Sequence, residues 1–226
     1  MDQVPFYLSL SFIALVVFTL ITFFNASGKN KGALMVVLAF ALAQALLSQR
    51  GFFLDSDAIP PRLLFILLPT VTIIVLAFIT RAGKRLIVNF DLEQYTYLHT
   101  VRVGVEIVLF YLFVYQLVPE SMTFSGRNFD ILAGLTAPIM GYWGFRKSKI
   151  SKRWLLIWNW VCLALVCQVM ITGILSVPSP IQQLSFDAPN TGVLHFPFVW
   201  LPGIIVPIVI FGHLVTIKRL SKSDTT

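Results

Sequence analysis

Residues 154–175 read WLLIWNWVCLALVCQVMITGIL, a mostly apolar run without a single charged side chain. About 20 apolar residues in a helix cover the hydrocarbon core of a bilayer. Backbone amides find no water in lipid, so such a run is expected to be a helix. A strand of an outer-membrane barrel would instead alternate in polarity. The stretch therefore predicts a transmembrane α-helix.

Six further runs of this kind occupy residues 4–24, 33–53, 63–79, 101–118, 131–145 and 196–217. The composition agrees, because 57% of the residues are apolar, 12% are charged and the mean hydropathy is +0.84. These values lie outside the range of water-soluble domains. We therefore expect an all-α integral membrane protein, with residues 1–226 forming one transmembrane domain, a bundle of seven helices.

The basic residues predict the orientation of the bundle. Every lysine falls in the first, third or fifth loop or in the C-terminal tail. The opposite side of the bundle carries only three arginines, Arg50 near the end of the second run and Arg62 and Arg127 in loops. The positive-inside rule makes the lysine-rich side cytoplasmic. The N-terminus is then outside and the C-terminus cytoplasmic, in a multi-pass protein of the cell (inner) membrane. The net charge of +7 is accordingly a topology signal, so the expected partner is lipid and not nucleic acid. The sequence also allows the protein to form a homo-oligomer.

A few polar residues lie inside the predicted spans, where they are costly and often functional. Glu106 lies about 10 Å beyond an inner boundary near His99. His213 and Asn159 lie at a similar depth in the last two runs. We expect the three to form an inner polar layer that binds a proton or an ion. Alternatively, Arg102 pairs with Glu106 one turn away and only neutralises its charge.

Three of the runs contain interior prolines, among them Pro69 in residues 63–79, and a capping pattern extends another run. Pro138 lies within residues 131–145, and Pro202 and Pro207 lie within residues 196–217. Proline leaves a backbone carbonyl unbonded, and transporters use such broken helices to frame a solute path. The spacing of Asp91 and Gln94 is that of a capping box, which predicts that the helix over residues 101–118 begins near residue 92.

The outer rim carries a second group of candidates in the segment PESMTFSGRNFD, residues 119–130. Asn128 or Asp130 is expected to cap the helix that follows, and Arg127 beside that helix end is expected to hold an anion. Glu120, Asp130 and His195 are also ligand types that suit a divalent metal ion, although their spacing matches no metal motif.

The sequence lacks the residues that several kinds of membrane-protein chemistry require. No lysine lies within a span, which excludes a retinal Schiff base, and the chain has no HExxH motif and no phosphate-binding glycine loop. One haem held by His99 and His213 is an alternative, and the cofactor is otherwise unknown.

We expect a protein that binds or transports a small solute or ion through the helix bundle, with proton linkage as an option. A membrane-embedded enzyme or metal-dependent protein with a site at the outer rim is the alternative. A ligand-sensing or assembly subunit is the second alternative.

Overall fold

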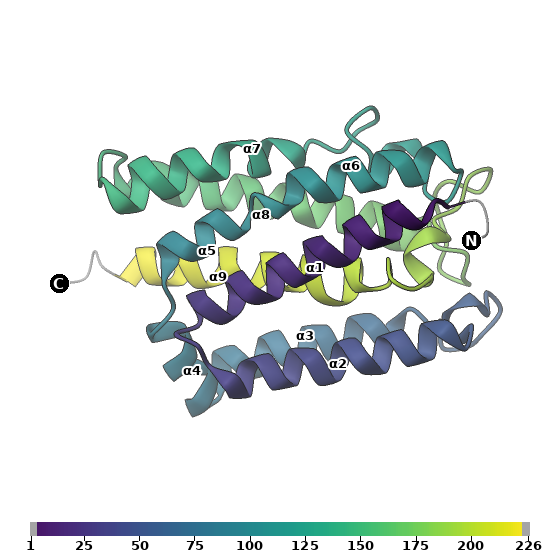
Figure 1. Cartoon of the computed structure of the whole chain (residues 1–226), viewed down its shortest axis with the longest axis horizontal. Helices are drawn as coiled ribbons and strands as arrows, with labels where there is room; N and C mark the ends of the chain where they lie inside the picture. Colours follow the sequence, from purple (N-terminus) through teal and green to yellow (C-terminus); the bar gives the residue numbers. More distant parts are fainter. Residues whose placement is uncertain (1–3, 223–226) are drawn as a thin grey trace.

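The computed structural model describes residues 4–222, which form helices and loops and no strand. The long helices run side by side along the longest axis of the molecule (Figure 1). In chain order the elements are α1 (Phe6–Ala26), α2 (Lys31–Gln49), η1 (Phe52–Leu54), α3 (Leu64–Ile79), α4 (Arg81–Val88), α5 (Leu92–Leu98), α6 (Val101–Val114), η2 (Glu120–Met122), α7 (Ile131–Ile139), η3 (Met140–Arg146), α8 (Lys152–Leu175), η4 (Gly192–Leu194), η5 (Leu201–Ile205) and α9 (Val206–Lys222).

Five helices within residues 4–222 are long and apolar enough to cross a bilayer: α1, α2, the combined span of α5 and α6, α8, and the combined span of η5 and α9. A sixth is counted when α3 and α4, which meet at a bend of 79°, are taken as one span. The prediction of an all-helical membrane protein is therefore supported, whereas the predicted count of seven spans is not confirmed, since five or six helices of residues 4–222 meet this criterion. Large apolar side chains on the outer faces of α1 and α2 are exposed, as expected of surfaces that contact lipid.

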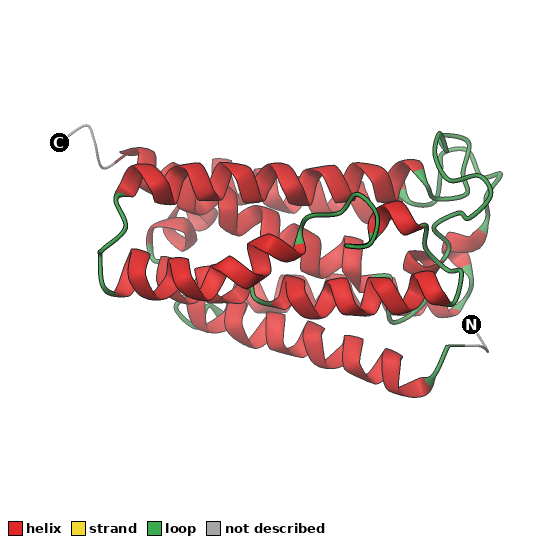
Figure 2. Cartoon of the chain, turned by 90° about the horizontal axis from the view of Figure 1, so that it is seen from above, coloured by secondary structure: helices red, strands yellow, loops and turns green. Residues whose placement is uncertain are grey.

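The fifth predicted span, residues 131–145, corresponds to α7 and η3. Together they cover residues 131–146 and are about 24 Å long at 1.5 Å per residue. Gly134 of α7 packs against Val103, and Gly141 of η3 packs against Tyr97, so the helix lies beside α5 and the first turn of α6. The preceding loop returns along the rest of α6 toward the middle of the bundle (Figure 2). The loop between α6 and α7 therefore occupies space beside α6 that a longer α7 would fill.

The two runs predicted to be broken at prolines are broken, whereas α3 continues through Pro69 as an α-helix. After Pro138 the helix continues as the π-helical segment η3, and the π-helical segment η5 contains Pro202 and ends two residues before Pro207. A π-helical segment interrupts the regular hydrogen-bond ladder and is frequent at functional sites. The predicted cap is also confirmed, because the Asp91 carboxylate accepts a hydrogen bond from the Gln94 amide at 3.1 Å and α5 begins at the next residue after Asp91.

Helices α5 and α9 approach each other closely at Tyr95 and Gly212. Tyr95 is buried, its hydroxyl donates to the Ile208 carbonyl, and its ring lies against Gly212. A Cβ atom on Gly212 would lie 1.5 Å from the Tyr95 ring. Only glycine permits this approach, and the contact brings α9 next to α5 and α6.

We predict that Gly212→Ala destabilises the protein by about 1–3 kcal/mol, because the added methyl group forces the Tyr95 ring out of its position. Thermal unfolding in detergent, followed by circular dichroism, measures the change. Gly32→Ala on the exposed start of α2 is the matched control, and it should leave the unfolding temperature unchanged or raise it. Equal unfolding temperatures for the two variants would contradict the predicted role of Gly212.

Candidate functional site

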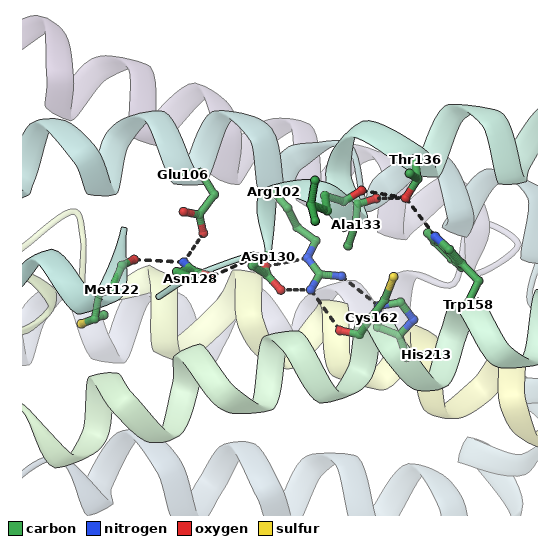
Figure 3. A network of polar contacts seen from close by, with 11 residues as sticks. Arg102, Glu106, Met122, Asn128, Asp130, Ala133, Thr136, Trp158, Cys162 and His213 are labelled. Carbon is green, nitrogen blue, oxygen red and sulfur yellow. Dashed lines mark hydrogen bonds and ion pairs between the residues drawn. The ribbon is translucent and has the colours of Figure 1, made fainter. Parts of the chain in front are cut away.

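A buried ion pair lies at the centre of the bundle. Arg102, in the first turn of α6, donates from Nε to Asp130 Oδ2 at 2.6 Å, and its Nη2 donates to Asp130 Oδ1. Nη2 also donates to the carbonyl oxygen of Cys162 on α8 at 3.0 Å. The residues Arg102 and Asp130 are only 2% and 5% exposed, so both charges are removed from solvent and lipid. The pair ties α6 to the start of α7 and to α8 (Figure 3).

The network continues from Arg102 to His213 on α9. Arg102 Nη1 lies 3.1 Å from His213 Nε2, and His213 Nδ1 lies 2.9 Å from Asn159 Oδ1 on α8. A guanidinium only donates, so His213 Nε2 accepts. The Asn159 amide nitrogen donates to the Leu155 carbonyl at 2.8 Å, which leaves Oδ1 to accept from His213 Nδ1. These contacts define a neutral imidazole that carries its proton on Nδ1.

Glu106 lies one helical turn after Arg102 but does not pair with it. Its Oε1 accepts from the amide nitrogen of Asn128, which also donates to the Met122 carbonyl at 2.9 Å. Asn128 Oδ1 in turn accepts from the Asp130 backbone amide at 2.9 Å. Asn128 therefore links the Glu106 carboxyl to the residue that holds Arg102.

The second oxygen of the Glu106 carboxyl, Oε2, is buried and has no hydrogen-bond partner. Glu106 lines a cavity of about 60 Å³ between α6, α8 and the η5–α9 junction. Asp130 and Asn190 line the same cavity, and Asn190 Oδ1 is likewise buried without a partner. This volume has room for a few water molecules or one small ion. The remaining lining is mostly apolar: Leu63, Val105, Leu109, Met122, Val166, Val169, Met170, Gly173, Ile174, Val177, Val193, Leu201, Pro202 and Val206.

His99 completes the buried cluster on the other side of His213. The two imidazole rings are stacked, with centroids 4.0 Å apart and planes 9° apart, and the Trp158 ring meets each of them nearly edge-on. Two rings in stacking contact leave no room for a porphyrin between them. The structure therefore contradicts the alternative of a single haem held by His99 and His213.

The structure brings together the inner polar residues that the sequence singled out. Arg102, His213 and Asn159 form one chain of contacts, and Glu106 joins it through Asn128 and Asp130. The predicted pairing of Arg102 with Glu106 is wrong, because the guanidinium donates to Asp130 from Nε and Nη2 and to His213 from Nη1.

The predicted outer-rim sites are not assembled. Arg127 is exposed, whereas Asn128 and Asp130 turn into the bundle, and the side chain of Asp130 makes no capping hydrogen bond to α7. An anion site of these three residues is therefore not formed. Within residues 4–222 no group of three or more His, Cys, Asp or Glu side chains is placed to hold a metal ion, so Glu120, Asp130 and His195 are not brought together. Asp130 is engaged by Arg102, and burial lowers the pKa of the half-buried His195.

Sequence reasoning missed Asn190, which lies in the loop between α8 and α9. Its amide nitrogen donates to the Gly173 carbonyl at 3.0 Å, which places its free oxygen at the cavity. An asparagine in a long polar loop gives no sign of burial. Only the packing of the loop against the end of α8 reveals its position.

We predict that Arg102→Met and Asp130→Asn each destabilise the protein by about 3–5 kcal/mol, because each leaves an unpaired buried partner. The double variant Arg102→Met/Asp130→Leu removes both charges and should recover a large part of the loss. Thermal unfolding in detergent, followed by fluorescence-detected gel filtration, measures both effects.

The exposed ion pair between Arg62 and Asp55, at 3.5 Å, is the matched control. Arg62→Met should cost less than about 1 kcal/mol, since solvent screens such a pair. Additive losses in the double variant at Arg102 and Asp130 would show that the two side chains are not coupled.

No curated protein and no solved structure matches the chain. One family model does match, over residues 59–221, a stretch that contains all the residues of the buried network and of its cavity. The chain belongs to the family described by that model as a domain of unknown function (DUF8737).

Proposed function

We propose that the protein binds or transports a small cation or a proton through the helix bundle, and that Glu106 is the exchangeable site. The observation that carries this proposal is the free Oε2 of Glu106 at the cavity. A carboxylate in an apolar interior needs a compensating partner for each oxygen. Oε1 has Asn128, whereas Oε2 has a cavity, so a proton or a small cation is the partner that fits.

The charges around Glu106 support an exchangeable species of positive charge. Arg102 and Asp130 neutralise each other, and the contacts of His213 define a neutral ring. Glu106 is thus the one described carboxyl in this network without an ionic partner. An anionic solute would meet the unpaired Glu106 carboxylate at the cavity and would be repelled.

The breaks in two helices support a path through this region. Pro202 and Leu201 of η5 line the cavity, and α7 begins only at its edge, at Asp130. Discontinuous helices of this kind line ion and substrate sites near the middle of transporters. From Glu106 the contacts continue through Asn128, Asp130 and Arg102 to His213, whose ring can accept a proton when the contact to Arg102 opens.

The proposal includes the orientation predicted from the basic residues, with the N-terminus outside and seven passes of the chain. The loop of residues 115–130 together with α7 and η3 then counts as the fifth pass. The distribution of lysines supports this orientation. In it, the cavity lies on the side of the external loops and His213 lies toward the cytoplasm.

We predict that Glu106→Gln keeps the fold and abolishes proton or cation flux, because glutamine fills the same space and can still meet Asn128 but cannot carry the exchanged charge. The assay uses liposomes that contain the purified protein and a trapped pH dye, with a potassium diffusion potential as the driving force. A loss of at least tenfold in the protein-dependent rate is expected. Repeating the assay with sodium in place of potassium distinguishes a proton from a sodium ion.

Glu120→Gln is the matched control, since Glu120 is exposed in the loop before Asn128. It should transport at the wild-type rate. Unchanged flux in Glu106→Gln would rule out Glu106 as the exchangeable site. A carbodiimide that attacks protonated carboxyls in apolar surroundings gives a second test on the wild-type chain. Mass spectrometry should locate the label on Glu106.

A further inference from the structure

A groove separate from the Glu106 cavity opens between α2 and α3, with α9 behind it. Its volume is about 280 Å³. Its walls are almost wholly apolar, and Thr70 and Thr80 are the only lining residues with polar side chains. The wall residues named in full are Phe23, Ala33, Val36, Val37, Phe40, Ile73, Ile74, Leu76, Ala77, Leu86, Gly203, Ile204, Pro207, Ile208 and Phe211. The walls come from helices that contact lipid, so the groove is a continuation of the bilayer interior.

One end of the groove lies at the junction of α3 and α4, where Thr80 and Leu86 line it. The chain bends by 79° at this junction, so α4 crosses the end of the α2–α3 pair instead of continuing along it (Figure 1). The Thr80 hydroxyl accepts from the Gly83 amide at 3.2 Å and begins α4. Ile87 is buried on the inner side of α4, and Val88 is exposed.

The same end carries a cluster of positive charge. Arg81, Lys84 and Arg85 of α4 are exposed, and Lys29 and Lys31 before and at the start of α2 are exposed beside Ala33 of the groove. No acidic residue occurs between Lys29 and Gln49 or between Arg62 and Phe90. Lys84 and Arg85 also line a surface hollow on α4 together with Val88 and Asn89. A helix with a basic face and an apolar face at the membrane surface attracts anionic headgroups.

We propose that the groove and the basic cluster form one binding site for an anionic phospholipid from the leaflet on the α4 side. An acyl chain occupies the apolar groove, and the phosphate meets Lys84 and Arg85 at its end. The charge complementarity selects the occupant, because an uncharged apolar ligand would leave the basic cluster without a partner. A soluble anion would likewise leave the groove empty. This site is independent of the function proposed for Glu106.

Native mass spectrometry of the delipidated full chain in detergent tests the proposal. Phosphatidylglycerol and phosphatidylcholine with identical acyl chains are titrated against the wild-type protein. We expect the first to bind at least tenfold more tightly at a stoichiometry of one. Inorganic phosphate should not compete. Equal retention of the two lipids, or displacement by inorganic phosphate, would overturn the proposal.

Two pairs of variants locate the site. Lys84→Gln/Arg85→Gln should weaken phosphatidylglycerol binding about tenfold. The control Lys147→Gln/Lys149→Gln removes the same charge from exposed positions after η3, at the same end of the bundle, and should have no effect. Equal weakening by both pairs would show a general charge effect and would refute a site at α4.

A substitution within the groove tests the acyl-chain part. Val36 lines the groove and is 50% exposed, whereas Val17 on α1 is 47% exposed and does not line it. Val36→Trp should reduce phosphatidylglycerol binding severalfold, and Val17→Trp should not. Both positions face outward, so both variants are expected to fold. Full binding by Val36→Trp would exclude the groove as the acyl-chain site.

Discussion

The ion pair between Arg102 and Asp130 is the interaction on which the centre of this structure depends. An arginine in the first turn of a helix surrounded by lipid must find an acidic partner inside the bundle, since solvent does not reach it. The nearest acidic residue in sequence, Glu106, lies on the same helix and therefore cannot link Arg102 to a different helix. Asp130 can link Arg102 to a different element, because it directly precedes α7. The ion pair holds the loop before Asp130 inside the bundle, and α7 is correspondingly short.

Because α7 is short, polar loop residues lie inside the bundle next to α6. Because α7 starts beside Arg102, residues 115–130 fill the space next to the C-terminal part of α6, and Asn128 contacts Glu106. One Glu106 oxygen is thereby satisfied, and the other is left at a small cavity that Asn190 also reaches. The same ion pair that ties the helices together therefore leaves one carboxylate oxygen at the cavity without a hydrogen-bond partner.

The two proposed sites use different parts of the molecule. The Glu106 cavity is small and combines carboxylate and amide oxygens with apolar walls, whereas the groove at α2, α3 and α9 is larger and almost entirely apolar. Both are lined by the broken η5–α9 helix, but by different residues of it. Leu201, Pro202 and Val206 line the cavity, and the groove is lined by Gly203, Ile204, Pro207, Ile208 and Phe211. Both depend on this break, because an irregular helix cannot fill the space beside it as evenly as a regular one.

The sequence by itself determined the helical membrane class, the cap at Asp91, the breaks near Pro138 and Pro202, and the choice of Glu106, Asn159 and His213 as the polar residues inside the bundle. These features follow from local composition and from helical spacing, which fix depth along a helix. The partners of Arg102 and Glu106, the inward turn of Asn128 and Asp130, and the place of Asn190 were decided by the tertiary structure alone. Loop residues carry no periodicity that reports depth, and a long-range ion pair forms only after the helices have packed.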